Sequence, residues 1–161
     1  MDLEEVIANA YYESVIGIRA GDSASESEMI RRYISEAGSI IIPNKNETKV
    51  KVINEVLKEF GLSPAVHLET HTNSCDLSRM PAITKAMMAL DISPCDLVIA
   101  RGRLGVPGSG SMLVIVDRKG RILSAALSPS HTIHAKTVAE AVRDEMQSAL
   151  ERIGFVKTDI I

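Results

Sequence analysis

The feature that most constrains this chain is the alternation of amphipathic helical segments with short β-branched runs along its 161 residues. Strands separated by helices favour parallel pairing, whereas two strands joined by a tight turn pair antiparallel. Residues 112–117 and 121–127 have the pattern of such a hairpin, with Gly120 suited to a positive φ in the turn. We therefore expect an α/β fold: a three-layer domain with a mixed β-sheet flanked by helices.

The expected elements follow from apolar periodicity and from glycine and proline breaks. We expect helices over 3–18, 25–37, 50–60, 81–90 and 136–153, and strands over 39–42, 65–69, 96–100, 112–117 and 121–127. Ser25 and Glu28 have the spacing of a capping box at the second helix. No linker interrupts the pattern, so we expect a single nucleotide-binding α/β domain over 1–161.

Composition excludes several classes of protein. The net charge of −3 and an aromatic content of 3% without Trp argue against nucleic acid as a partner. No apolar run approaches the ~20 residues that span a bilayer, and the acidic first residues resemble neither a signal nor a transit peptide. Cys75 and Cys95 form no CxxC pair. We expect a cytoplasmic protein with no membrane partner.

Charge is unevenly distributed along the chain. Residues 1–38 carry eight acids and three bases, whereas residues 39–161 carry thirteen acids and fifteen bases. An anionic ligand should therefore bind the second part. The two acidic amphipathic helices at the start are expected to pack, against the sheet or against a second subunit.

Polar loops fall at 43–49, 71–79, 101–111 and 128–134. The first three follow predicted strands, and ligands of open α/β sheets usually bind at the carboxyl ends of the strands. We therefore expect these loops to form the functional site together.

The 43–49 loop leads from a strand into a helix, whose first turn offers unpaired N–H groups that suit phosphate. Asn44, Lys45, Asn46 and Lys49 add amide donors and cations. The alternative is an Asn- or Thr-capped helix with solvated lysines. The loop is no Walker motif, because GxxxxGK[ST] is absent.

The 101–111 loop contains two arginines, four glycines and no acid. Arginine pairs phosphate with a fork of donors, and glycine lets backbone N–H groups approach a ligand. Arg101 and Arg103 are therefore candidates to bind phosphate, with backbone donors from Gly108, Ser109, Gly110 and Ser111. The alternative is a flexible glycine-rich linker, and a GxGxxG fingerprint is missing.

The 71–79 loop is rich in hydrogen-bonding side chains. Thr72 and Asn73 are candidates to contact a base or ribose, Arg79 a phosphate, and Asp76 a Mg²⁺ ion. The alternative is a loop that satisfies its own backbone, with Ser78 capping the next helix.

Histidine and cysteine give weaker signals. His131 and His134 are three residues apart, and zinc could use them only if distant loops converge. The 128–134 loop more readily lines the site by hydrogen bonding, and imidazole is the side chain most often used for proton transfer, so both histidines are candidates for that role. Cys75 could be a nucleophile near His71, although a buried thiol is the simpler state.

Three long segments carry a resemblance that covers most of the chain. They read HTNSCDLSRMPAITKA, ARGRLGVPGSGSMLVIVD and GRILSAALSPSHTIH, and together they resemble the HcgB family of methanogenic archaea. The resemblance implies a homodimeric guanylyltransferase in biosynthesis of the iron-guanylylpyridinol (FeGP) cofactor of [Fe]-hydrogenase. It implies that GMP from GTP is joined to a pyridinol hydroxyl with release of pyrophosphate. It also implies a fold similar to inosine-triphosphate pyrophosphatases and Maf-like proteins.

A remoter resemblance to those pyrophosphatases includes departures. Residues 44–49 are similar to the T-x-N-x-x-K loop of that family, which implies that Asn46 and Lys49 hold the triphosphate. Met80 stands at the acid position of an E-N-A-x-x-K-A segment, and Arg101 lies where an acid pair would be. Arginine cannot hold metal ions or activate water, so the site suits transfer to another nucleophile rather than hydrolysis.

The leading hypothesis is a GTP:pyridinol guanylyltransferase with Mg²⁺ as an inferred cofactor, in which Arg101, Arg103 and His131 are catalytic. Two alternatives stay open. The first is a pyrophosphatase for noncanonical nucleoside triphosphates, and the second is a non-catalytic nucleotide-binding assembly subunit.

Overall fold

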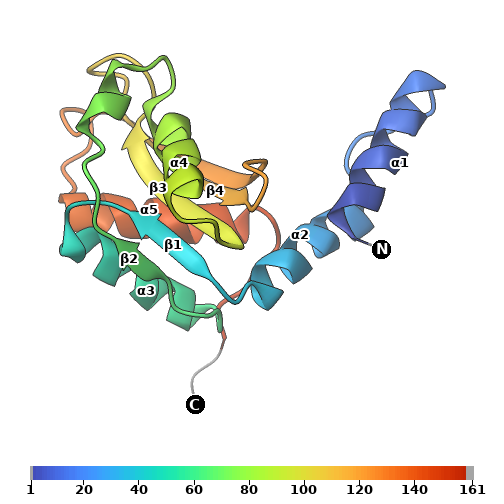
Figure 1. Cartoon of the computed structure of the whole chain (residues 1–161), viewed down its shortest axis with the longest axis horizontal. Coiled ribbons are helices and arrows are strands. Elements are labelled where there is room, and N and C mark those ends of the chain that lie inside the picture. The colour runs from blue at the N-terminus through green and yellow to red at the C-terminus, as the bar shows by residue number, and fades with distance from the viewer. Residues whose placement is uncertain (1, 159–161) are drawn as a thin grey trace.

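The computed structural model describes residues 2–158 and contains one mixed β-sheet flanked by helices (Figure 1). The strands are β1 (Ile40–Pro43), β2 (Val66–Leu68), β3 (Leu97–Arg103), β4 (Ser111–Asp117) and β5 (Ile122–Ser128). The helices are α1 (Leu3–Val15), α2 (Ala24–Glu36), α3 (Glu47–Glu59), α4 (Pro81–Ile92) and α5 (Val138–Glu151), with a short 3₁₀ helix η1 (Asn73–Leu77). The expected α/β class with a mixed sheet is confirmed.

Two hydrophobic clusters, one on each face of the sheet, hold the layers together. Helices α3 and α5 cover one face with residues such as Ile53, Leu57 and Met146, packed on Ile99 and Ile115. Helix α4 covers the other face with small side chains. These are Ala82, Ala86 and Ala89, which pack on Val98, Ala100 and Val114. Alanine lets α4 lie close to the sheet, whereas the larger side chains of α3 and α5 fill a thicker layer.

The strand order is β2-β1-β3-β4-β5. Strand β1 is parallel to β2 and β3, and the β3–β4 and β4–β5 pairs are antiparallel. Strands β1, β2, β3 and β5 therefore all point the same way and end at one edge of the sheet, where β4 begins. We call this the loop edge, and all four predicted polar loops leave the sheet there.

Two glycines bring segments together at the loop edge. A Cβ on Gly102 would lie 3.1 Å from the Cα of Ala82, so glycine lets the start of α4 rest directly on β3. Gly110 has a φ of +92°, and a Cβ there would lie 2.2 Å from the carbonyl oxygen of Ser128. The turn after β3 therefore touches the segment after β5.

Three local expectations are wrong. Strand β3 does not end at 100, because its pairing with β4 continues to Arg103 opposite Ser111, and the connecting turn shrinks to 104–110. The capping box of α2 is formed by Ser23 and Glu26 rather than by Ser25 and Glu28. Ser78 does not cap α4, because its hydroxyl donates to the carbonyl oxygen of Cys75.

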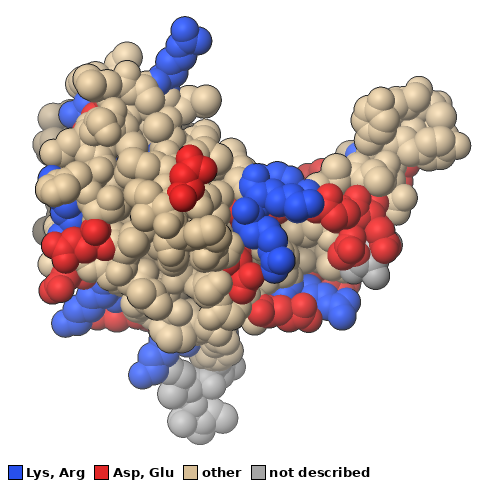
Figure 2. Space-filling view, viewed as in Figure 1, with Lys and Arg blue, Asp and Glu red and all other residues tan. Residues whose placement is uncertain are grey.

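Helices α1 and α2 form an arm that extends away from the sheet (Figure 1). Helix α1 buries none of its residues, and Tyr11, Val15 and Ile18 are 72%, 64% and 65% exposed. The tip of the arm carries no charged side chain on the face that Figure 2 shows. Residues 2–158 include no helix with both the length and the apolar character needed to cross a bilayer.

Candidate active site

Three cationic side chains from three different elements meet at the loop edge. Lys49 lies in the first turn of α3, Lys85 on α4 and Arg101 on β3, and each is only partly exposed. The ammonium group of Lys85 donates to the main-chain carbonyl oxygen of Arg101 at 2.7 Å. We call these three residues the cation cluster.

Burial and mutual repulsion perturb the lysines of the cation cluster. Burial lowers the pKa of Lys49, and the charges of Arg101 and Lys85 lower it further. Burial also lowers the pKa of Lys85, where Arg101 again acts in the same direction while Asp76 and Cys75 oppose it. Cations held together against desolvation and repulsion are stabilised by an anion, so the cluster is a candidate polyphosphate site.

Arg101 is held by a buried acid beneath it. The Nε of Arg101 donates to Oε1 of Glu145 at 2.7 Å, and its Nη2 donates to Oε2 of Glu145 at 3.2 Å and to Oγ of Ser111 at 3.0 Å. The Ser111 hydroxyl in turn donates to Oε2 of Glu145 at 2.6 Å. The side chain of Glu145 is 0% exposed.

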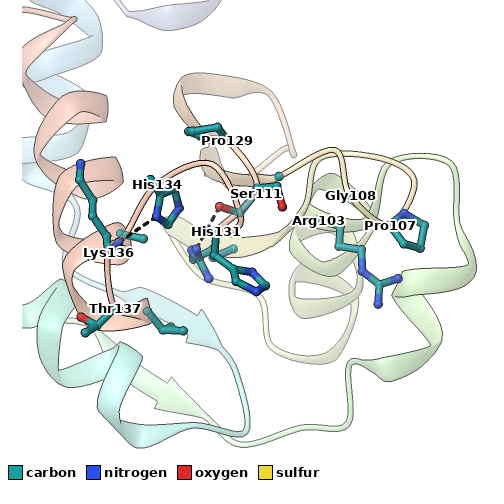
Figure 3. Close-up of a pocket in the computed structure, with 14 residues that line it drawn as sticks. Arg103, Pro107, Gly108, Ser111, Pro129, His131, His134, Lys136 and Thr137 are labelled. Carbon is teal, nitrogen blue, oxygen red and sulfur yellow. Dashed lines mark hydrogen bonds between the residues drawn. The ribbon is translucent and has the colours of Figure 1, made fainter.

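A cavity of about 400 Å³ opens beside Arg101 at the β3–β5 end of the loop edge (Figure 3). Its lining comes from β3, the 104–110 turn, the segment after β5 and the start of α5. These residues are Arg101, Arg103, Pro107, Gly108, Gly110, Ser111, Pro129, Ser130, His131, His134, Lys136, Thr137, Val138 and Ala141. Prolines and short aliphatic side chains give it apolar surface beside its polar groups, a combination typical of small-molecule sites.

The two histidines of the cavity differ in their hydrogen bonds. Nδ1 of His134 accepts from the backbone N–H of Lys136 at 3.2 Å, so a neutral His134 carries its proton on Nε2. Within residues 2–158, the ring of His131 makes no hydrogen bond, and its residue is exposed. Both ring nitrogens of His131 are therefore open to a ligand.

The 43–49 loop contributes less than its composition predicts. Asn44 is buried, its side chain accepts from the backbone N–H of Asn46, and its carbonyl oxygen pairs with the ring of His67. Asn46 is the N-cap of α3 and accepts from the N–H of Thr48. Lys45 lies apart from Arg101, in a smaller opening of about 310 Å³ with Glu69, Thr70 and His71. The structure thus makes Asn46 the N-cap of α3, whereas Asn44 holds the backbone of its own loop. Of the lysines at 45 and 49, Lys49 is the one at the cation cluster.

The 71–79 loop reaches the cation cluster through η1. The charge of Asp76 acts on Lys85, so this carboxylate lies near the cluster. Thr72 is buried, whereas Asn73 and Arg79 are exposed. Burial raises the pKa of the Cys75 thiol, which favours the inert thiol over the nucleophile.

The glycine-rich turn is a built structure rather than a flexible linker. The Ser109 hydroxyl donates to the carbonyl oxygen of Val106 at 2.6 Å and accepts from the N–H of Gly105 at 3.0 Å. The Ser109 N–H also donates to Val106. Ser109 therefore organises the turn, while Gly108 and Gly110 line the cavity.

The described part of the chain does not provide a metal site made of side chains alone. Residues 2–158 contain no group of three His, Cys, Asp or Glu side chains placed to hold an ion. Asp76 would hold a Mg²⁺ ion only together with oxygen ligands from a substrate phosphate, which is the usual way that Mg²⁺ binds to nucleotide sites.

Sequence reasoning missed two residues of this site. Lys85 lies in a predicted helix and not in one of the predicted polar loops, and α4 brings it over the end of β3. Glu145 stands on the buried stripe of α5 with Ala141, Val142 and Ala149. An acid in such a stripe is the signal that could have revealed it, because a buried carboxylate needs a cation.

An α/β sheet whose loop edge gathers three cationic side chains beside a partly apolar cavity has the features of a site for an anionic small molecule. The comparison with known families makes this specific. Residues 3–155 match the family described as FeGP cofactor biosynthesis protein HcgB, guanylyltransferase. The match covers nearly the whole chain, which therefore belongs to the HcgB family of guanylyltransferases.

Proposed function

We propose that this protein transfers GMP from GTP to the hydroxyl group of a substituted pyridinol and releases pyrophosphate. The observation that carries the proposal is the convergence of Lys49, Lys85 and Arg101 beside a cavity lined by His131. The family supplies the transferred group, because a guanylyltransferase moves GMP.

The three residues of the cation cluster are assigned to different phosphates of a bound triphosphate. Arg101 lines the cavity, so we assign it to the α-phosphate, where the new bond forms. Lys49 and Lys85 lie on α3 and α4 and are assigned to the β- and γ-phosphates. Cations there stabilise the charge that develops on pyrophosphate as the bond to the α-phosphorus breaks.

The acceptor ring is assigned to the cavity. The pyridinol oxygen attacks the α-phosphorus opposite the leaving pyrophosphate, and His131 takes the hydroxyl proton. His131 is preferred over His134 because its ring nitrogens are open, whereas Nδ1 of His134 is already a hydrogen-bond acceptor. Arg103 lies on the same face of β3 as Arg101, two residues along, and lines the same cavity. It is assigned to an acidic substituent of the acceptor or to the nucleotide.

Hydrolysis is disfavoured by the charges around the cluster. Activation of water for attack on a nucleoside triphosphate needs carboxylates to hold metal ions or to take a proton. Glu145 is engaged by Arg101 and Ser111 and has no exposed surface. Asp76 is the remaining acid identified near the cluster, and a single carboxylate suits a Mg²⁺ ion that arrives with the phosphates.

A homodimer is the second part of the proposal. A 13-residue helix with no buried residue is marginally stable by itself. Exposed apolar side chains gather at the end of α1 and in the turn that follows it, at Tyr11, Tyr12, Val15, Ile16 and Ile18. Contiguous exposed apolar surface marks an interface. We assign the arm to contact with a second copy of the chain.

Incubation of the protein with GTP, Mg²⁺ and a hydroxypyridine acceptor tests the activity. The proposal expects stoichiometric formation of a GMP–pyridinol adduct and pyrophosphate, measured by mass spectrometry and by a coupled pyrophosphate assay. Formation of GMP without any acceptor would instead support the pyrophosphatase alternative. Binding of GTP without turnover would support the non-catalytic one.

A further inference from the structure

Glu145 is a buried carboxylate with no exposed surface of its own. It lies on the inner face of α5, and its side chain is 0% exposed. Removing a carboxylate from water is costly unless hydrogen bonds and a cation compensate it. Here both oxygens are satisfied, Oε1 by Arg101 and Oε2 by Arg101 and Ser111.

The same contacts fix the donors of Arg101. A guanidinium group has five N–H donors, one on Nε and two on each Nη. The Nε–H is bound to Glu145, and the two N–H groups of Nη2 are directed to Glu145 and Ser111. Within the described chain, Nη1 has no hydrogen-bond partner, and Arg101 lines the cavity.

We infer that Glu145 is a positioning residue that, together with Ser111, clamps Arg101 so that its Nη1 donors face the reacting α-phosphate. This inference rests on the proposed function. Preorganised donors stabilise developing charge without reorganising during the reaction. A clamp from α5 and β4 keeps a flexible side chain in the single orientation that the transition state needs.

The clamp and a purely electrostatic role predict different kinetics. Glu145 carries a negative charge, so its removal leaves the cation cluster more positive. If charge alone mattered, a Glu145→Gln variant would bind GTP more tightly and keep its turnover. If positioning matters, the turnover of Glu145→Gln falls while its affinity for GTP is retained, because Lys49 and Lys85 still bind the phosphates.

The experiment compares the full chain with Glu145→Gln and Ser111→Ala variants. Glutamine keeps the shape of the side chain but turns one acceptor into a donor that faces the guanidinium. We expect kcat for adduct formation to fall at least about tenfold in Glu145→Gln, with KM for GTP changed less than about threefold. Ser111→Ala removes the hydroxyl that bonds both Arg101 and Glu145, and it is expected to lower kcat by a smaller factor, again with little change in KM for GTP.

A spectroscopic measurement tests the clamp in the absence of turnover. The ¹⁵N–¹H resonance of the Arg101 Nε, assigned by its loss in Arg101→Lys, should exchange slowly with solvent in the unmodified protein. It should exchange fast in Glu145→Gln. Added pyrophosphate should shift the Arg101 signals of the unmodified protein.

Each outcome decides the inference. Unchanged kcat in a folded Glu145→Gln variant, or a raised KM with unchanged kcat, overturns it. If that variant does not fold, the kcat of Ser111→Ala decides by the same criteria. If the unmodified protein forms no adduct, the proposed function has failed, and the exchange of the Nε proton alone decides whether the clamp exists.

Discussion

The ammonium group of Lys85 on α4 donates a hydrogen bond to the main-chain carbonyl oxygen of Arg101 on β3, with 2.7 Å between the two atoms. This contact connects α4, on one face of the sheet, to β3. The side chain of Arg101 also binds Glu145 on α5, which covers the other face. The site is therefore assembled from both outer layers, across the loop edge.

Replacing Lys85 by methionine should weaken polyphosphate binding while the fold is kept. Met retains most of the apolar stem, and loss of one charge-assisted contact should reduce pyrophosphate affinity about 10- to 100-fold. The free energy of unfolding should change by no more than about 1 kcal/mol, because the desolvated charge is removed together with its one hydrogen bond. Calorimetric titration and urea unfolding measure the two quantities.

Lys51→Met is the matched control, because Lys51 lies on the same helix as Lys49 but is exposed. It should bind pyrophosphate like the unmodified protein, whereas Lys49→Met should behave like Lys85→Met. Equal losses for Lys49→Met and Lys51→Met would show that general surface charge, and not the cluster, attracts the ligand.

Polyphosphate binding should take up protons at alkaline pH. The pKa values of Lys49 and Lys85 are lowered from 10.5, so part of their charge is lost below that pH. A bound polyphosphate favours the charged form and raises both pKa values, so affinity should fall as the pH rises through the lowered values. Titrations in buffers with different ionisation enthalpies measure the uptake, and its absence in the Lys49→Met, Lys85→Met double variant identifies its source.

The same shifts predict how the ligand-free protein responds to pH. Between the lowered pKa of the folded lysines and 10.5, the unfolded chain binds more protons than the folded one. Their contribution to the free energy of unfolding should therefore increase as the pH rises through this interval. The difference between the unmodified protein and the double variant, followed by denaturant unfolding across that interval, isolates this contribution. A difference that stays constant with pH would contradict the assigned shifts.

How far the sequence predicts this structure depends on the range of the interactions. The hairpin at Gly120 was predictable because a turn residue and flanking β-branched residues are neighbours in sequence, and the structure gives Gly120 a φ of +81°. The shared edge of the loops at 43–49, 71–79 and 101–111 also followed, since strand direction is set by whether a helix or a turn connects two strands. Similarity to the pyrophosphatase and Maf-like folds stays a prediction.

The site was less predictable because its contacts join residues that are distant in sequence. Arg101 looked like part of a loop because the glycines that follow it resemble a linker, yet pairing with β4 extends the strand. Its partner Glu145 is 44 residues away, and no local pattern connects the two. The side-chain oxygens of Asn44 and Asn46 accept from backbone N–H groups of their own loop or helix, and contact of their amide donors with a nucleotide stays a prediction.

His131 should contribute more to turnover than His134. Loss of a general base lowers the rate by about 10²- to 10⁴-fold, so His131→Gln should fall in that range. His134→Gln removes a side chain whose Nδ1 accepts from the backbone of Lys136, and it should cost less than about tenfold. Single-turnover rates of adduct formation measure both, and a larger loss in His134→Gln would reverse the assignment.

Charges on the arm should separate the proposed dimer. A Tyr11→Glu, Val15→Glu double variant places carboxylates on exposed apolar positions of α1, so a monomer without change of fold is expected. Light scattering coupled to size exclusion gives the mass. Val156→Glu, which changes an exposed apolar residue outside the arm, should leave the mass unchanged. A dimer that persists in the double variant would place the interface elsewhere.

The most direct test of the central claim is a single incubation of GTP and Mg²⁺ with and without a pyridinol acceptor, followed by mass spectrometry. The account predicts a GMP–pyridinol adduct and an equal amount of pyrophosphate when the acceptor is present, with GTP intact when it is absent. Release of GMP at the same rate without acceptor would contradict the account, because water would then be the nucleophile at this cation cluster.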